Sequence, residues 1–302
     1  MKPTLAFPIP EVTEFAIDEI TGTSEKYLDI PYAKESECQI MDIYLPEKKK
    51  EKYPLILYIH EGAFMFGSKR DKRMQTLFEA LNRGFAIASM DYRKADQVTW
   101  PAPVYDVKAA IRFLKAGAKK YHLDPDRFTV WGMSAGAYYA AMAAVTNGNP
   151  GFEDPDMGYS EYSSDVQAVV DLCGACSGFQ NIDDALKENG AIRANHNEAN
   201  SPESILMGAP LQKIRELCRM ASPITYLGKD APFFFIMHCT EDPVVPVQQS
   251  RLFEEAIAAR AGREKVMAVY REKAADHAKP DYGTQEIVDM ALSFLERVLS
   301  ME

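Results

Sequence analysis

Alternating apolar and polar segments along the chain predict strands that alternate with helices. Short segments rich in aliphatic, aromatic and β-branched residues predict strands at 39–46, 54–60, 85–92, 127–133, 166–174, 232–239 and 265–272. Apolar residues recur at helical spacing in 71–83, 103–121, 135–147, 248–261 and 284–299. This order is typical of a three-layer α/β domain, with a mostly parallel central sheet and helices on both faces.

One segment, residues 178–222, interrupts this rhythm. It lies between two predicted strands, is too long for a simple crossover, and mixes polar and apolar residues with helical fragments such as 210–217. We therefore expect a small cap insertion over the C-terminal edge of the sheet, within a single domain that spans 1–302. A long helical excursion on the surface is the alternative.

Size and charge narrow the function classes. The chain has 302 residues, enough for one large domain, and a net charge of −10, which repels nucleic acid and anionic membrane surfaces. No window approaches the apolar length of a membrane helix, and Pro8 and Pro10 break the only apolar patch near the N-terminus. We expect no nucleic-acid partner, no membrane association and no signal peptide.

The five cysteines are odd in number and irregularly spaced, which favours reduced thiols and a cytoplasmic location. Cys173 and Cys176 form a CxxC pattern, which suggests redox chemistry or half of a zinc site. The pattern follows an apolar run and has no second CxxC, so we predict structural cysteines and no metal site.

The segment 132–136 reads Gly-Met-Ser-Ala-Gly, at the junction of a predicted strand and a predicted helix. A serine on such a tight turn projects its hydroxyl from the fold, and flanking glycines allow the strand and helix to approach closely. The following helix directs its free N–H groups at the reacting centre. We predict that Ser134 is a nucleophile.

Acyl transfer also needs N–H donors for the oxygen that becomes negative. Gly62 and Ala63 follow the strand at 54–60, and Ala135 follows the serine. We assign the oxyanion hole to these three residues. His60 precedes the loop and is predicted to brace it rather than to act as the base.

A base and an acid follow in the order that this arrangement requires. His277 lies in a loop after the last predicted strand, whereas His122 and His196 are predicted at the surface. Asp242 follows the strand at 232–239 and would orient the imidazole, with Glu241 as the alternative acid.

Several strings now give the chain a resemblance to a known family. It resembles α/β-hydrolase esterases of the hormone-sensitive-lipase-like and bacterial acetyl-xylan/feruloyl esterase type, over about residues 38–299. The strings are HEGAFMFGSK (60–69), MDYRKADQVTWPAPVYDVKAAIRFL (90–114), LDPDRFTVWGMSAGAYYA (123–140), SPES (201–204), ASPITYL (221–227) and HCTEDPVVPVQQS (238–250). The resemblance implies an α/β-hydrolase fold, a triad of Ser134, Asp242 and His277, the same oxyanion donors, no cofactor, and short acyl esters, often acetyl groups on sugars or aryl alcohols.

Two positions depart from the family pattern. Glu61 stands where the family usually has a glycine, and the loop before His277 lacks the usual glycines. A carboxylate that faced a developing oxyanion would oppose catalysis. We therefore predict that Glu61 points away or pairs with a cation.

Apolar residues near these motifs are candidates for the substrate pocket, although core packing explains each of them equally well. They are Phe64, Phe66, Trp100, Met133 and Tyr138.

Together these features predict a serine carboxylesterase that acts on a small-molecule short-chain acyl ester, including acetylated or feruloylated carbohydrate. An amide hydrolase of the arylformamidase or peptidase type is the first alternative. A non-catalytic binding protein on the same fold is the second. The sequence leaves open whether the chain forms a homodimer.

Overall fold

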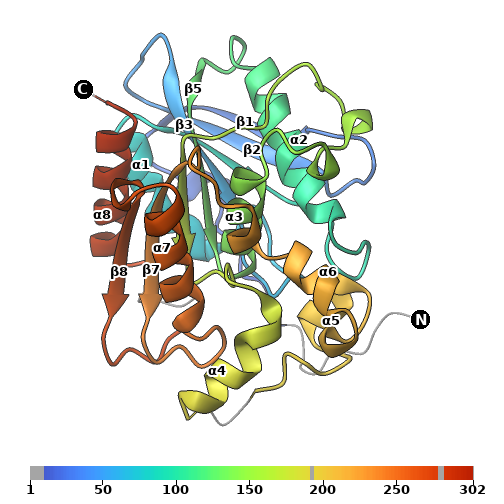
Figure 1. Ribbon diagram of the computed structural model, residues 1–302. Helices are drawn as coiled ribbons and strands as arrows, with labels where there is room; N and C mark the ends of the chain where they lie inside the picture. The colour runs from blue at the N-terminus through green and yellow to red at the C-terminus, as the bar shows by residue number, and fades with distance from the viewer. Residues whose placement is uncertain (1–9, 191–193, 278–281, 302) are drawn as a thin grey trace.

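The computed structural model describes residues 10–190, 194–277 and 282–301, and a single eight-stranded sheet runs through its centre (Figure 1). The strands are β1 (Thr23–Pro31), β2 (Ile40–Pro46), β3 (Tyr53–Ile59), β4 (Ala86–Met90), β5 (Leu123–Met133), β6 (Ala168–Leu172), β7 (Phe233–Cys239) and β8 (Val266–Arg271). Each of the seven predicted strands is present. β1 was not predicted.

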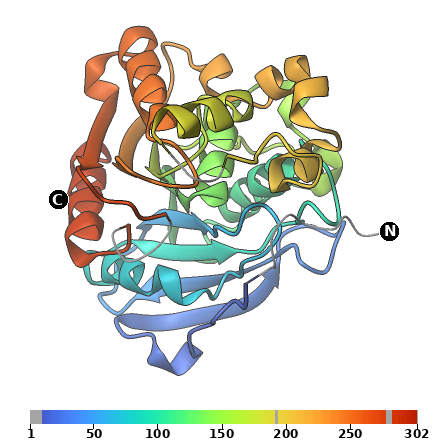
Figure 2. The same cartoon turned by 90° about the horizontal axis from the view of Figure 1, so that it is seen from below.

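The sheet has the order β1-β2-β4-β3-β5-β6-β7-β8, so β1 and β8 form opposite edges (Figure 2). β2 pairs antiparallel with both β1 and β4, and every later pairing is parallel. The prediction of a mostly parallel sheet is confirmed. Parallel strands direct their carboxyl ends to one side, where loops can converge.

The helices are α1 (Glu79–Asn82), α2 (Ala102–Ala116), α3 (Ala135–Val145), α4 (Ile182–Glu188), α5 (Pro202–Met207), α6 (Arg215–Met220), α7 (Gln248–Arg260) and α8 (Gln285–Val298). The helix predicted at 71–83 is largely a 3-10 helix, Lys72–Phe78, which α1 continues. The other four predicted helices lie where the apolar spacing placed them.

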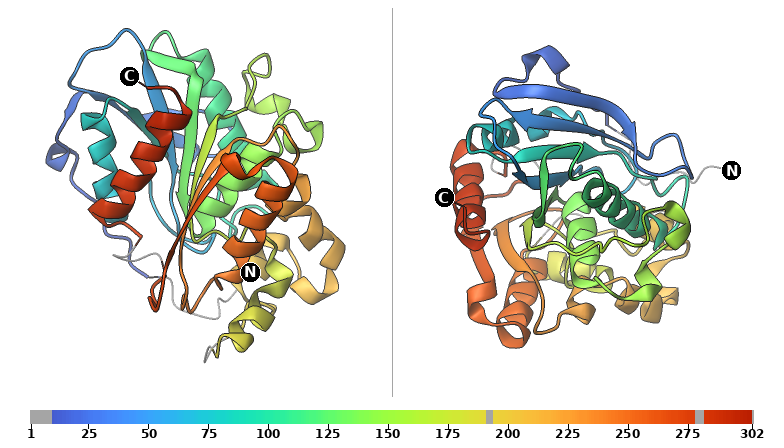
Figure 3. Two further views of the ribbon diagram at one scale, coloured as in Figure 1. Left: turned by 60° about the vertical axis from the view of Figure 1, so that its left-hand side comes forward. Right: turned by 90° about the horizontal axis from the view of Figure 1, so that it is seen from above.

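Alternate residues of the central strand β3 enter two separate cores. Leu55, Leu57 and Ile59 pack into the core beneath α2, α3 and α7, whereas Ile56 and Tyr58 pack into the core beneath α1 and α8. Figure 3 shows these two helical layers on opposite faces of the sheet. The alternation follows from the two-residue side-chain period of a strand.

Helices α4, α5 and α6 belong to the connection between β6 and β7, and they lie beyond the carboxyl ends of the parallel strands (Figure 1). This is the part of the chain for which a cap was predicted. Within the described ranges, no helix is long and apolar enough to cross a membrane.

Candidate active site

Ser134 occupies the sharp turn between β5 and α3. Its backbone has φ 52° and ψ −118°, a conformation that is strained for a residue with a side chain. A β-carbon on Gly132 would lie 2.2 Å from the carbonyl carbon of Gly136, and one on Gly136 would lie 2.0 Å from the carbonyl oxygen of Ile59. The two glycines are therefore needed for the close packing that holds this turn.

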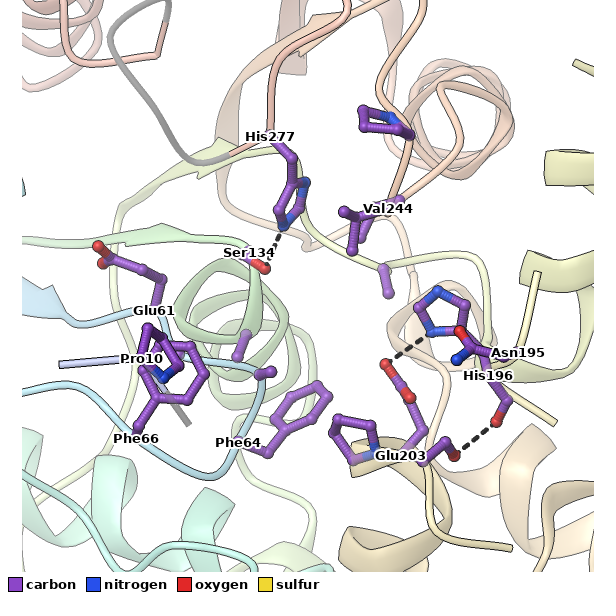
Figure 4. Close-up of a pocket in the computed structure, with 18 of the residues that line it drawn as sticks. Pro10, Glu61, Phe64, Phe66, Ser134, Asn195, His196, Glu203, Val244 and His277 are labelled. Atoms are coloured by element: carbon purple, nitrogen blue, oxygen red, sulfur yellow. Dashed lines mark hydrogen bonds and ion pairs between the residues drawn. The ribbon is translucent and has the colours of Figure 1, made fainter. Parts of the chain in front are cut away.

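Ser134 lies in a hydrogen-bonded chain with His277 and Asp242. The Ser134 Oγ is 2.8 Å from Nε2 of His277, and Nδ1 of the same ring is 2.7 Å from Oδ2 of Asp242. The structure thus brings together three residues from distant parts of the sequence. Figure 4 shows His277 directed at Ser134.

Several groups hold the Asp242 carboxylate in place. Its Oδ1 accepts hydrogen bonds from the backbone N–H groups of Val244 (2.8 Å) and Val245 (2.9 Å), and its Oδ2 accepts one from the hydroxyl of Tyr282 (3.0 Å). Burial alone would raise the pKa of Asp242, but attraction to His277 and the hydrogen bonds outweigh it and hold this pKa well below its usual range. The carboxylate therefore stays charged. The alternative acid, Glu241, is exposed.

Gly62, Ala63 and Ala135 line the same cavity as Ser134. Gly62 (φ 126°) and Ala63 (φ 47°) have left-handed backbone conformations, and the Gly62 carbonyl accepts the N–H groups of Met65 and Phe66. Within the described residues, neither the Gly62 nor the Ala63 N–H has an acceptor. These amides are free to donate to a ligand in the cavity.

Glu61 forms a buried ion pair with Arg73. Its Oε1 is 2.5 Å from Nε of Arg73, and its Oε2 accepts a hydrogen bond from the Tyr58 hydroxyl at 2.9 Å. Burial raises the pKa of Glu61, although Arg73 acts in the opposite direction. In Figure 4 the carboxylate extends away from Ser134. The expected pairing with a cation is therefore present.

His60 is buried and stacks on Tyr92, with ring centroids 4.3 Å apart. Its Nδ1 is 2.7 Å from the carbonyl oxygen of Glu61, a contact that braces the loop. Burial lowers the pKa of His60 to about 3, so the ring is neutral.

The cavity has a volume of about 500 Å³. Of the five candidates for a substrate pocket, Phe64 and Phe66 line this cavity and the other three do not. Trp100, Met133 and Tyr138 pack into the two cores, because their side chains are needed to fill space beside the sheet. The Tyr138 hydroxyl donates instead to the carbonyl of Ala221, at 2.7 Å.

The prediction that His196 lies at the surface is wrong. Instead of lying at the surface, it lines the cavity with Asn195 and Glu203, and its Nδ1 is 3.0 Å from Oε1 of Glu203. His122 is exposed, as predicted. The Ser-Pro-Glu string marks the start of α5 in the sequence, but it carries no signal that Glu203 reaches the cavity.

Among the described residues, Cys173, Asp242 and His277 could each offer one ligand atom to a metal, with these atoms within 4.8 Å of one another. Asp242 and His277 are already engaged with each other and with Ser134. The second cysteine of the CxxC, Cys176, is buried and lies 3.2 Å from the Asp171 carboxylate. The side chains of this cluster therefore already have partners within the protein.

Comparisons with known proteins show the family of the chain. The family model BD-FAE matches residues 41–257, and the chain belongs to this family. Esterase LipQ of Mycobacterium tuberculosis is 30% identical over 249 residues, which cover 80% of this chain and 56% of LipQ. The chain spans about half the length of the curated relatives that it matches.

Solved structures have the same architecture. A truncated carbohydrate esterase from gut microbiota superposes with a TM-score of 0.80 at 27% identity, covering 95% of this chain and all of that one. A bifunctional GH43-CE protein of Bacteroides eggerthii gives 0.78 at 28% identity, covering 91% of this chain and 35% of that one. The chain has the α/β-hydrolase fold.

Proposed function

We propose that the chain is a serine carboxylic-ester hydrolase that acts on short-chain acyl esters. The observation that carries this proposal is the Ser134–His277–Asp242 chain, with contacts of 2.8 and 2.7 Å, at the wall of a cavity that two unpaired backbone amides also border. The named esterase activities of the relatives support it.

In the first half-reaction, His277 Nε2 takes the hydroxyl proton while Ser134 Oγ attacks the carbonyl carbon of the ester. The carbonyl oxygen becomes negative and accepts hydrogen bonds from the N–H groups of Gly62, Ala63 and Ala135. The tetrahedral intermediate collapses, His277 returns the proton to the leaving alcohol, and the acyl group stays on Ser134.

In the second half-reaction, water takes the place of the alcohol. His277 removes its proton, the hydroxide attacks the acyl carbon, and Ser134 leaves with the proton from His277. Asp242 stays ionised throughout, holds the imidazole in one tautomer, and stabilises the imidazolium. No step requires a cofactor.

We place the acyl group beside Phe64 and Phe66, which line the cavity together with Gly62 and Ala63. The segment 178–222, which we propose acts as a cap, contributes Asn195, His196, Ser201, Pro202 and Glu203 to the lining. We also propose a cytoplasmic location, which the five free cysteines support.

Hydrolysis of short p-nitrophenyl esters tests the proposal. Ser134→Ala is expected to lower kcat by at least about 10³-fold, because the nucleophile and its base act as a unit. Equal activity of the wild type and this variant would overturn the assignment of Ser134.

A further inference from the structure

The wall of the cavity opposite Glu61 holds an unusual polar pair. Nδ1 of His196 is 3.0 Å from Oε1 of Glu203, and their side chains are only 11% and 9% exposed. Figure 4 shows the two residues across the cavity from Glu61 and Phe66, with Ser134 between the two walls. The pair therefore faces whatever part of a substrate extends beyond the reacting carbonyl.

The local structure holds both partners firmly. The Asp183 carboxylate accepts hydrogen bonds from the backbone N–H groups of His196 (2.8 Å) and Asn197 (2.9 Å). Ser201 caps α5 by accepting the N–H of Ser204 at 3.0 Å, and it donates to the carbonyl of His196 at 2.6 Å. A site fixed in this way loses little conformational freedom when a ligand binds.

Glu203 has unused hydrogen-bonding capacity. Its Oε2 is buried and accepts no hydrogen bond from any described residue. A buried acceptor without a donor is costly, and such exceptions are often resolved by a ligand or by water. The residue lines the cavity, so a donor on a bound substrate can supply the missing hydrogen bond.

The charge of the His196–Glu203 pair limits which chemical group can donate a hydrogen bond to Glu203. Burial opposes protonation of His196, but attraction to Glu203 outweighs it and raises the pKa of His196. The imidazole beside the Glu203 carboxylate offsets part of its negative charge, so the pair attracts an ammonium group weakly. A neutral hydroxyl can donate to Glu203 without disturbing this balance.

Resting on the proposed function, we propose that Glu203 and His196, with Asn195 beside them, form a subsite for hydroxyl groups on the alcohol portion of the ester. A short acyl group carries no hydroxyl, so the donor must belong to the alcohol. The substrate class is then an acyl ester of a polyhydroxylated alcohol, such as a partly acylated sugar. Glu203 is a specificity-determining residue that accepts a hydroxyl of the alcohol.

The test uses three acetyl esters: p-nitrophenyl acetate, a monoacetylated methyl glycoside with its other hydroxyls free, and the same glycoside with those hydroxyls methylated. The wild type is expected to favour the free glycoside over the methylated one by at least about 10-fold in kcat/KM. Glu203→Gln is expected to lose most of this preference, with a larger fall in kcat/KM for the free glycoside than for p-nitrophenyl acetate.

Glu254→Gln is a matched control, because it makes the same change on α7, where Glu254 accepts a hydrogen bond from Tyr270. It should retain the full preference. A parallel loss on all three substrates in Glu203→Gln would assign Glu203 a structural role and overturn the proposal. If Glu203→Gln does not fold, Glu203→Asp, which shortens the side chain and keeps the carboxylate, is compared on the same two glycosides and should also lose most of the preference.

The two proposals fail in different ways. A wild type that hydrolyses p-nitrophenyl acetate but treats the two glycosides alike contradicts the hydroxyl subsite alone. A wild type that hydrolyses none of the three esters contradicts the proposed function.

Discussion

The guanidinium of Arg73 lies 2.5 Å from the carboxylate of Glu61, at the loop that borders the reacting centre. Arg73 also donates two hydrogen bonds to the carboxylate of Asp71. One cation therefore serves two carboxylates beside a site where negative charge develops. This arrangement explains how the loop tolerates a glutamate in place of the glycine.

Removing the cation should harm catalysis more than removing the glutamate. Arg73→Gln leaves Glu61 buried without its partner, so we expect kcat to fall by at least about 10-fold and stability by a few kcal/mol. Glu61→Gln alone should change kcat less than about 5-fold, because the carboxylate does not face Ser134.

The double variant Glu61→Gln/Arg73→Gln should recover much of the lost kcat, and steady-state kinetics with thermal melting would measure this coupling. A large gain in kcat in Glu61→Gly would instead mean that the native glutamate opposes the oxyanion.

Tyr282 is predicted to be a positioning residue for the triad. Its hydroxyl donates to Oδ2 of Asp242 and accepts the N–H of Cys239, both at 3.0 Å. Tyr282→Phe should lower kcat by about 3- to 10-fold with little change in KM, because Asp242 then holds the His277 ring less firmly.

Tyr270→Phe is the matched control for that experiment, since Tyr270 donates to Glu254 away from the triad. A kcat of Tyr282→Phe equal to that of this control would leave no positioning role for the hydroxyl.

The glycine that follows Ser134 by two residues should be irreplaceable. In Gly136→Ala the new β-carbon would meet the Ile59 carbonyl oxygen at 2.0 Å, so we expect a loss of about 3 kcal/mol or failure to fold. Gly228→Ala is the control, because an added β-carbon there meets nothing within 4 Å. Equal melting temperatures for the two variants would contradict the packing described at this turn.

Acid should destabilise the protein partly through His60. Its pKa is about 3 in the folded protein against an ordinary value of 6.5, so the unfolded chain binds more protons between these limits. The stabilisation that the neutral His60 contributes is complete above pH 6.5 and decreases as the pH falls, by about 3 kcal/mol at pH 4.5.

The effect of His60 on the pH dependence of stability must be separated from that of other buried groups. Burial raises the pKa of carboxyls such as Glu61, and these groups favour the folded state at low pH, which is the opposite direction. Denaturant unfolding of the wild type and of His60→Gln at pH 7 and pH 4.5 measures how much the free energy of unfolding of each protein falls between these two pH values. The stability of the variant should fall less than that of the wild type. If the wild type and the variant differed in unfolding free energy by the same amount at both pH values, His60 could not be a neutral, buried group.

The sequence predicted the parallel part of the sheet well but missed β1. The parallel strands are buried on both faces and give continuous apolar runs, such as β3. β1 lies at the edge, pairs with β2 alone, and contains Glu25, Lys26 and Asp29, with most of its residues partly or fully exposed. Its pattern therefore resembles that of a polar loop.

The pocket was harder to predict than the nucleophile. Ser134 carries its own local signal in the glycines at 132 and 136, whose close contacts the structure explains. From sequence alone, an aromatic residue near the site, such as Tyr138, is as compatible with a core position as with a pocket position. In the folded protein Tyr138 packs in the core. The pairing of His196 with Glu203 depends on how 194–207 folds, which local patterns do not specify.

The covalent intermediate on Ser134 is the most direct test of the account. Wild-type protein is mixed with p-nitrophenyl acetate, quenched in acid during turnover, digested, and analysed by mass spectrometry. We predict that the peptide containing Ser134 gains one acetyl group, and that Ser134→Ala gains none and releases no p-nitrophenol above background. An acetyl group on another residue that turns over at the catalytic rate, or undiminished hydrolysis by Ser134→Ala, would contradict the assignment of Ser134 as the nucleophile.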